Sequence, residues 1–589
     1  MTKSSNIHSI NNITISQRPK KAKPRRGNSR RMGRVTFDKN KAIRPGINNI
    51  TNSNRQTKGE TKTRDFLENP AIFPSQYNEK VTKSSPSASP TVGFISLGCP
   101  KNLVDSEVMM GLLDRAGARL TSHPEEAEIL IVNTCSFIDT AKQESIDTIL
   151  EMARHKTTGR AKKLIVAGCL VERYRDEIQK SIPEVDAVVG TGELESILAA
   201  AGLAASPAAP SHFNILTASH TAETRPGKES LSGTHNPETK ASRPEGDHRE
   251  QQGRFRRNDW QGATHLLPTY LYDETTPRFL TTPKSSAYIK IAEGCDHPCS
   301  FCVIPNLRGK FRSRRFESIV AEAQQLIARG VREITLIGQD TTCYGEDLGL
   351  TDGLATLLDA LASIPDLRWL RFLYAYPNRI TSRLLETIAS HDNICNYLDL
   401  PLQHASPAIL KRMKRGGSAD IFLKTLEKVR KTIPGVALRT SFIVGFPGES
   451  SEDLAILEDF IKEAKFDWLG VFNYSDEEGS GAFSLDQKIP RRTIEARKRR
   501  LMKLQQSISK RAKQQWVGRE LVILAEGESE ETPLLWEGRT QFQAPEIDGK
   551  LYINDFGSLP ALEPSRFYRA QITEAHDYDV VARILSGPL

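Results

Sequence analysis

Three cysteines stand close together directly after one apolar segment of this chain. The segment AYIKI (residues 287–291) predicts a buried strand, and the loop GCDHPCSFC places Cys295, Cys299 and Cys302 after it with CxxxCxxC spacing. Three thiolates within eight residues can bind one face of a cubic [4Fe-4S] cluster, which leaves the fourth iron open for another chelator. The spacing therefore favours a short loop at a strand end, as at the C-terminal mouth of a β/α barrel.

Zinc is the main alternative ligand for this loop. A structural zinc site requires a fourth cysteine or histidine, and His297 lies inside the loop as a candidate. The other alternative is that the three cysteines are simply buried, since cysteine is common in cores. The compact spacing favours the iron-sulfur cluster over both.

A second group of cysteines is dispersed along the sequence but equivalent in position. Cys99, Cys135 and Cys169 each follow an apolar segment, and the segments are VGFISL (92–97), AEILIVN (127–133) and KKLIVAG (162–168). Helical patterns follow them, from 102 to 116, from about 139 and from about 171, and DAVVG (186–190) ends the series. This alternation predicts a parallel, doubly wound α/β domain over residues 91–204. Because parallel strands end at one edge, the three sulfurs should converge there.

A second α/β series follows in the C-terminal half. Its expected strands are AYIKI, REITLIG, RWLRFLY, YLDL, GVALRTSFIVG and DWLGVFNYS, with helical segments between them. Six such strands predict a parallel, open (β/α) barrel over residues 281–485. A basic amphipathic helix is expected at 490–516, and the alternating sequence of 518–587 predicts a small all-β barrel.

Charge and composition separate two further segments from these domains. Residues 1–90 hold 19 Lys and Arg against 5 Asp and Glu, so the net charge of +9 belongs to this segment and the rest of the chain is acidic. We expect a disordered basic tail there, with an organelle transit peptide as the less favoured alternative. Residues 205–280 are rich in Ala, Pro, Thr, Ser and charge, which is typical of a linker or insertion.

The remaining features constrain the environment of the protein. The sequence has no run of about 18 apolar residues and no secretory leader, so we expect a soluble, cytoplasmic protein with no membrane partner. Eight cysteines in 589 residues are too few for a secreted disulfide framework. Cys343 and Cys395 have no partner at ligand spacing and are expected to be ordinary packed or loop residues, although Cys343 lies near a strand end.

The two cysteine groups and the terminal β domain resemble the methylthiotransferase family of radical S-adenosylmethionine (SAM) enzymes. The resemblance covers about 91–204 and 281–587, and it implies a cluster domain, a radical SAM barrel (281–517 with its trailing helix) and a TRAM domain. SLGCPKNLVDSE (96–107), CDHPCSFCVIPNLRGKFRSR (295–314) and QAPEIDG (543–549) resemble the branch that modifies a ribosomal protein. The sister tRNA branch typically has Gln and Met in place of Pro100 and Lys101.

The resemblance also implies the chemistry. Cys295, Cys299 and Cys302 would hold the cluster that cleaves SAM, and Cys99, Cys135 and Cys169 would hold a second [4Fe-4S] cluster that serves the sulfur transfer. The product would be a methylthio group on the β-carbon of one aspartate in small-subunit ribosomal protein S-twelve. A reducing electron donor is required, and we expect a monomer.

SAM contacts are expected where barrel strands end, because ligands bind at that mouth. The candidates are Gln339, Asp340, Gln403, Arg439 and Ser441. The segment GFPGE (445–449) follows the last two, and its glycines would let the backbone approach a ligand closely.

The charge of the terminal domain bears on the substrate. Residues 518–589 hold 13 Asp and Glu against 6 Arg and Lys. An acidic domain would repel a phosphate backbone and attract a basic ribosomal protein. This favours the protein substrate over the nearest alternative, a tRNA adenosine methylthiotransferase. A non-catalytic iron-sulfur protein that binds the ribosome is the alternative of another class.

Overall fold

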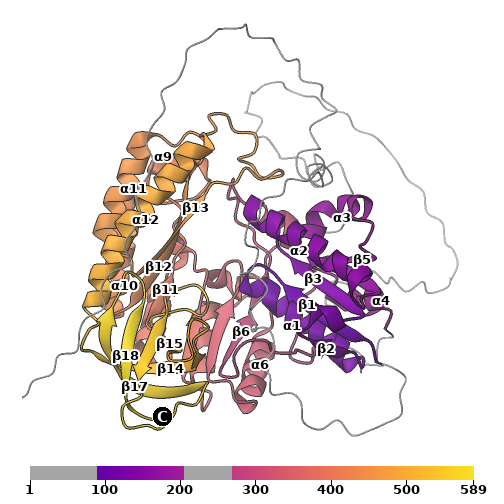
Figure 1. Ribbon diagram of the computed structural model, residues 1–589. Coiled ribbons are helices and arrows are strands. Elements are labelled where there is room, and N and C mark those ends of the chain that lie inside the picture. Colours follow the sequence, from indigo (N-terminus) through magenta and orange to yellow (C-terminus); the bar gives the residue numbers. More distant parts are fainter. Residues whose placement is uncertain (1–88, 204–267) are drawn as a thin grey trace, which may run out of the picture. The chain divides into compact units, whose positions relative to one another are not determined.

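The computed structural model describes residues 89–203 and 268–589 (Figure 1). The expected basic tail therefore lies outside the described residues except for its last two positions, as does most of the expected 205–280 linker. No helix in the described ranges is long and apolar enough to cross a membrane.

The N-terminal domain is a five-stranded parallel sheet in the order β2-β1-β3-β4-β5 (Figure 1). Its strands are β1 (Thr91–Ser96), β2 (Arg119–Thr121), β3 (Ile129–Thr134), β4 (Lys163–Gly168) and β5 (Ala187–Val189), and its helices are α1 (Pro100–Arg115), α2 (Asp139–Thr158), α3 (Cys169–Ser181) and α4 (Ile197–Ala201). Short β2 at the edge is an addition to the predicted strands. The doubly wound α/β fold is confirmed.

Helices cover both faces of this sheet because its strands are apolar on both sides. In β3, Ile129 and Ile131 pack in one hydrophobic cluster with α1, whereas Leu130 and Val132 pack in another with α2 and α3. A strand buried on both faces gives a continuous apolar run instead of an alternating one. This is the pattern of the three segments that precede the cysteines.

The second domain is the open parallel barrel. Its six principal strands are β6 (Ser286–Lys290), β9 (Glu333–Ile337), β10 (Trp369–Phe372), β11 (Tyr397–Asp399), β12 (Ala437–Val444) and β13 (Trp468–Asn473), and a two-stranded ribbon is formed by β7 (Ala292–Glu293) and β8 (Arg312–Ser313). Its helices are α5 (Ile304–Arg308), α6 (Phe316–Ala328), α7 (Gly353–Ala362), α8 (Ser382–Ser390), α9 (Pro407–Arg412), α10 (Ala419–Thr432), α11 (Ser451–Ala464) and α12 (Arg491–Gln514).

The six strands run in chain order around the barrel. β6, β9 and β10 form one parallel sheet, β11, β12 and β13 form another, and a bridge between Leu370 and Ile394 links the two. Within the described chain β6 does not pair with β13, so the barrel is open, as predicted. Along β12, Thr440, Phe442 and Val444 are buried while Arg439 and Ser441 are only half-buried, because alternate side chains face opposite sides of a strand.

A closed five-stranded barrel, in the order β14-β15-β16-β18-β17, ends the chain (Figure 1). The strands are β14 (Glu520–Glu528), β15 (Trp536–Thr540), β16 (Leu551–Asp555), β17 (Arg566–Ala575) and β18 (Val580–Ser586). The loop between β15 and β16, which contains QAPEIDG, binds the β/α barrel. Trp468 Nε1 donates to the Phe542 carbonyl at 2.7 Å, and the Tyr397 hydroxyl donates to Asp548 at 2.7 Å.

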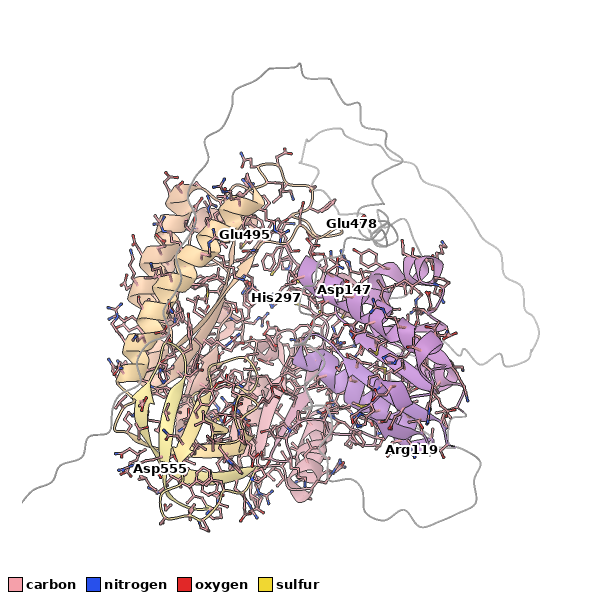
Figure 2. The ribbon with its side chains drawn as sticks, in the orientation of Figure 1. Arg119, Asp147, His297, Glu478, Glu495 and Asp555 are labelled. Carbon is pink, nitrogen blue, oxygen red and sulfur yellow. The ribbon has the colours of Figure 1, made fainter. Side chains whose placement is uncertain are left out.

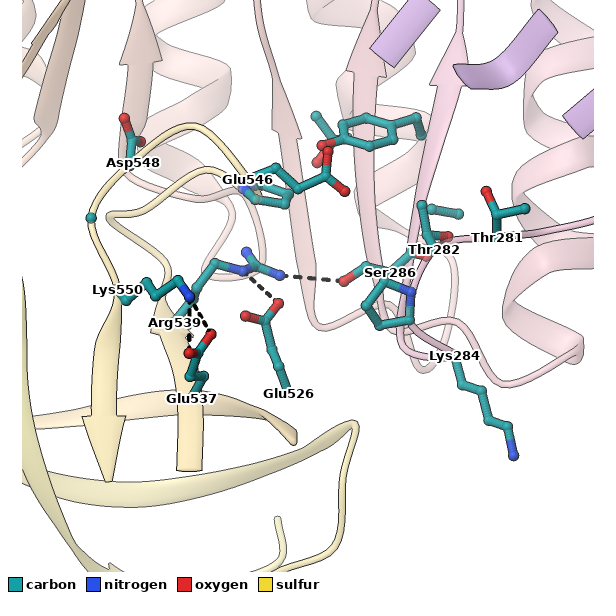
Figure 3. Close-up of a pocket in the computed structure, with 17 residues that line it drawn as sticks. Thr281, Thr282, Lys284, Ser286, Glu526, Glu537, Arg539, Glu546, Asp548 and Lys550 are labelled. Atoms are coloured by element: carbon teal, nitrogen blue, oxygen red, sulfur yellow. Dashed lines mark hydrogen bonds and ion pairs between the residues drawn. The ribbon is translucent and has the colours of Figure 1, made fainter. Parts of the chain in front are cut away.

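These contacts involve the first residues of barrel strands, so the β domain lies at the end opposite the cysteine loop. A cavity of about 470 Å³ lies at this junction, lined by residues of both domains (Figure 3). In the wall of this cavity, Arg539 of β15 donates a hydrogen bond to the hydroxyl of Ser286, the first residue of β6.

Glu333, the first residue of β9, is the central carboxylate of the ion pairs at this junction. Its carboxylate is fully buried and accepts from Arg371 at 3.0 Å, from Arg539 at 2.6 Å and from the Ser286 hydroxyl at 2.6 Å. Burial alone would raise the pKa of Glu333, but the two guanidinium groups lower it to about 2. The carboxylate is therefore held charged between two buried cations.

We expect Glu333→Gln to lower the free energy of unfolding by about 3–5 kcal/mol, because it leaves the buried guanidinium group of Arg371 without a carboxylate among the described residues and that of Arg539 with Glu526 alone. Denaturant titration of the full chain measures the effect. Glu520→Gln, at the exposed first position of β14, is the matched control and should change stability by less than about 0.5 kcal/mol.

The difference should also depend on pH. The folded-state pKa is depressed, so the stabilisation is present above the unfolded value of 4.5 and is lost as the pH falls towards 2. The wild-type and Gln chains should converge in stability over this window. A constant difference across it would contradict the role of this carboxylate.

Candidate active site between the two cysteine groups

The N-terminal cysteines lie at the carboxyl ends of three neighbouring strands. Cys99 caps α1 after β1, Cys135 follows β3, and Cys169 is the first residue of α3 after β4. Because Gly98 has no side chain, the loop that carries Cys99 can lie close to Cys135. Gly98 has φ +94°, and a Cβ atom there would lie 2.8 Å from the Cβ of Cys135 and 3.2 Å from its Sγ.

The three thiols share one electrostatic environment. Burial is the main cause that raises the pKa of Cys169 to about 12; Arg308 opposes this shift, and Cys135 and Cys99 contribute to it. Burial and Cys99 likewise raise the pKa of Cys135. Arg308 Nη2 lies 3.5 Å from Cys169 Sγ. A cation directed at a sulfur is suited to a thiolate, the form in which cysteine binds iron.

The second group lies in the loop after β7. Burial raises the pKa of Cys302 to about 12 and that of Cys295 to about 11, and in each case other cysteines of the loop add to the shift. Arg415 Nη1 lies 3.5 Å from Cys299 Sγ. Both groups therefore combine three buried or half-buried sulfurs with one arginine, and both fit a three-thiolate cluster.

The two groups are neighbours in space. Cys169 packs in one buried cluster with Val303 and Leu307, and Val303 directly follows Cys302 in the chain. A second contact joins the domains nearby, where Arg173 of α3 donates to Glu477 at 2.6 Å and to the Glu478 carbonyl at 3.1 Å. The barrel mouth thus faces the cysteine edge of the N-terminal sheet.

A buried charge cluster between the domains was not predicted from the sequence. Arg308 donates to Asp105 and Glu293 at 3.0 Å each, and Lys290 also pairs with both carboxylates. Asp105 belongs to α1 and the other three residues to the barrel. Their positions give no sequence signal as a group, because each lies in an otherwise ordinary strand or helix pattern.

The end of the expected linker also belongs to the folded structure. Tyr272 is buried, and Arg278 pairs with Glu107 of α1 at 2.6 Å and with Glu322 of α6 at 2.7 Å. Residues 268–280 therefore connect the N-terminal domain to the barrel through buried contacts.

The candidate SAM contacts occupy two sides of the barrel. Gln339 donates to Glu293 at 2.6 Å, and its carbonyl oxygen is buried without a partner in the described chain. The Asp340 carboxylate accepts from His297 at 2.6 Å, from the Thr342 amide and from Cys343. Asp340 thus positions the ring of His297 within the cysteine loop (Figure 2).

On the other side, Arg439 and Ser441 lie on β12, and Gln403 bridges to that strand. Arg439 pairs with Asp399 at 2.9 Å and with Asp548 of the β domain at 3.4 Å. Gln403 has φ +72° and donates its amide to the Ser441 carbonyl at 2.8 Å. The structure brings Gln339 and Asp340 to the cysteine loop and Arg439 to the junction with the β domain.

His297 and the two remaining cysteines have local partners. His297 stacks on Tyr376 with ring centroids 4.0 Å apart. A ring nitrogen of His297, an Asp340 carboxylate oxygen and the Cys343 sulfur lie within 4.8 Å of one another, and no loop cysteine belongs to this group of described residues. Cys343 and Cys395 are both buried, as expected of packed residues.

Comparisons with known proteins agree with this architecture. Residues 91–190 match the model of Uncharacterized protein family UPF0004, residues 289–461 match the Radical SAM superfamily, and residues 517–585 match the TRAM domain. The chain is 63% identical over 515 residues to the ribosomal protein uS12 methylthiotransferase RimO of Koribacter versatilis. This match covers 87% of this chain and all of the relative. The chain is 55% identical to the RimO of Solibacter usitatus, over 84% of this chain and 95% of that one.

Among solved structures, the radical SAM methyltransferase TsrM of Kitasatospora setae matches with a TM-score of 0.41 at 14% identity, over 65% of this chain and 72% of that one.

The barrel with its three-cysteine loop is thus a radical SAM domain, in a class of enzymes that use SAM and an iron-sulfur cluster. Given the identity over nearly the whole of its relatives, the chain belongs to the ribosomal protein uS12 methylthiotransferase (RimO) family.

Gly98→Ala should prevent the N-terminal cysteines from binding iron, because the added methyl group collides with Cys135. Iron and sulfide per chain after anaerobic reconstitution measure this. Gly117→Ala is the matched control, since Gly117 has a similar φ of +89° but no atom of the described residues lies within 4 Å of the added carbon. Both variants carry the same backbone strain. Equal iron contents in the two variants would contradict the steric argument.

Proposed function

We propose that this protein is a radical SAM enzyme that adds a methylthio group to the β-carbon of an aspartate in small-subunit ribosomal protein S-twelve (uS12). The observation that carries the proposal is the packing of Cys169 on Val303 and Leu307, because it brings a sulfur-rich site beside the loop of the radical SAM domain. An enzyme that transfers sulfur to carbon needs both sites within reach of one substrate atom.

We assign one [4Fe-4S] cluster to each cysteine group. Cys295, Cys299 and Cys302 would hold the first, and Cys99, Cys135 and Cys169 the second. When bound, the clusters and SAM would supply the one-electron cleavage of SAM, the hydrogen abstraction and the sulfur, and a second SAM would supply the methyl group. Gln339, with its buried unpartnered carbonyl oxygen, remains our best-supported candidate for a SAM contact.

The side chains of the protein stabilise the sulfur ligands, orient the cysteine loop and exclude water. Arg308 and Arg415 direct guanidinium groups at one sulfur of each group, which stabilises thiolate ligands. Val303 and Leu307 pack against Cys169 and keep water from the space behind it. Asp340 fixes the ring of His297, and this limits the conformations of the cysteine loop.

The acidic β domain supports a protein substrate, although part of its charge is paired internally. Glu526 pairs with Arg539, Glu537 with Lys550, and Asp548 with Arg439. Exposed acidic side chains remain around the β14–β15 turn and at the end of β16, where Asp555 is exposed (Figure 2). They are Glu528, Glu530, Glu531 and Asp555. A basic ribosomal protein would be attracted to this surface.

The remaining expectations stay proposals. We propose a cytoplasmic monomer that receives its electrons from a separate reducing donor. The tRNA methylthiotransferase and the non-catalytic iron-sulfur protein are less favoured, since relatives at 42–63% identity are named uS12 methylthiotransferases. Both alternatives are outcomes of the experiment that follows.

The full chain, reconstituted anaerobically and given SAM, reductant and either uS12 or a tRNA pool, should place one SCH₃ in place of H on an aspartate of uS12. Mass spectrometry of both substrates measures this. The triple variant Cys99/Cys135/Cys169→Ala should cleave SAM without modifying uS12. The triple variant Cys295/Cys299/Cys302→Ala should not cleave SAM.

Other results would reject the proposal in distinct ways. Modified adenosine with unmodified uS12 would assign the protein to the tRNA branch. A reconstituted wild-type chain that binds iron but never cleaves SAM would instead support the non-catalytic alternative.

A further inference from the structure

Lys101, in the first turn of α1, is a buried cation that forms no ion pair with a carboxylate of the described residues. Only 8% of the residue is exposed. Its ammonium group donates to the Gly338 carbonyl at 3.3 Å and lies 3.3 Å from the centre of the Tyr374 ring. Within residues 89–203 and 268–589, no carboxylate oxygen forms an ion pair with it. A buried ammonium group with one long hydrogen bond is costly to maintain.

The position of Lys101 at the start of α1 adds to this cost. A positive side chain in the first turn of a helix opposes the helix dipole, and α1 has no acidic residue in that turn. Of the charged and titratable groups that act on Lys101, Cys99, Glu293 and Asp399 favour its ammonium form and Arg308 opposes it. Arg308 and Glu293 are already paired within the buried charge cluster, and Asp399 is paired with Arg439.

Tyr374, on which Lys101 lies, is held in an unusual conformation. Its backbone φ is +63°, a value that residues other than glycine adopt only at a cost in conformational energy. The Asp399 carboxylate accepts from the Tyr374 amide at 2.9 Å and so fixes this backbone. The ring is therefore rigidly placed beneath the ammonium group, at the end of β10 and beside the cysteine edge.

We propose that Lys101 binds the side-chain carboxylate of the substrate aspartate. This inference rests on the proposed function and deepens it, because it assigns the residue that recognises the reacting side chain. The carboxylate carbon is bonded directly to the β-carbon. When Lys101 holds the carboxylate, the reacting β-carbon is one bond from the bound group. Lys101 itself is two residues after Cys99 in the chain. The substrate supplies the counterion that the described chain lacks.

The test uses reconstituted full-length enzyme and two forms of uS12, one with the target aspartate and one with asparagine in its place. The wild-type enzyme should bind the aspartate form more tightly, by about 10- to 100-fold, the range for a hydrogen bond to a charged group. Lys101→Met, similar in size but uncharged, should bind both forms with the weaker affinity. Lys101→Arg should keep a preference for aspartate. Anaerobic fluorescence anisotropy measures all six affinities.

Lys513 offers a matched control elsewhere in the chain. It is also buried, and its ammonium group lies 3.6 Å and 4.4 Å from the rings of Trp468 and Trp516, with no hydrogen-bond partner in the described residues. Lys513→Met removes a comparable charge and should leave the aspartate preference unchanged. Iron content and thermal unfolding of each variant show whether the fold and the clusters are intact.

The outcomes separate this inference from the proposed function. A Lys101→Met enzyme that keeps the full aspartate preference would overturn the inference, and a change in its iron-sulfur absorption alone would show that Lys101 instead balances cluster charge. Equal binding of both uS12 forms by the wild-type enzyme would also overturn it, even if Lys101→Met does not fold. A wild-type enzyme that cleaves SAM but never modifies uS12 would reject the proposed function itself.

Discussion

The structure depends on a set of charges buried between two domains. Lys290 and Arg308 of the barrel share the carboxylates of Glu293, in the same domain, and of Asp105, in α1. Removing any member would leave an uncompensated charge in a dry interior, so the four residues specify one arrangement of α1 against the barrel mouth. Cys99 begins α1, and Arg308 also reaches Cys169. The cluster that joins the domains therefore also determines where the sulfurs lie.

A second series of contacts extends from the C-terminal domain to the same place. Asp548 pairs with Arg439, Arg439 with Asp399, and Asp399 binds the amide of Tyr374, whose ring lies under Lys101. The QAPEIDG segment, chosen from the sequence as a family feature, thus has a structural role inside the barrel. Asp548 of the β domain is thereby connected through Arg439 and Asp399 to the backbone of Tyr374.

Much of this could be predicted from the sequence, because parallel strands buried on both faces are continuous apolar runs. These runs located the sheet, the barrel and the convergence of Cys99, Cys135 and Cys169. The pairing of Asp105 with Lys290 and Arg308 could not be predicted, since it joins residues 185 and 203 positions apart that follow no spacing rule. The sequence of residues 268–280 indicates a linker, because Tyr272 and Arg278 are isolated in a polar segment and only their partners in the structure show that they are buried.

The single strand β9 shows how the barrel separates stability from chemistry. It begins at Glu333, whose carboxylate is enclosed by Arg371 and Arg539 at the junction with the β domain. Past its other end lie Gln339 and Asp340, which bind Glu293 and His297 beside the cysteine loop. In a parallel barrel all strands share this polarity, so one end can be sealed by buried ion pairs while the other presents loops. The strained backbone at Tyr374 and Gln403 lies towards the mouth, and the rigid junction below supports it.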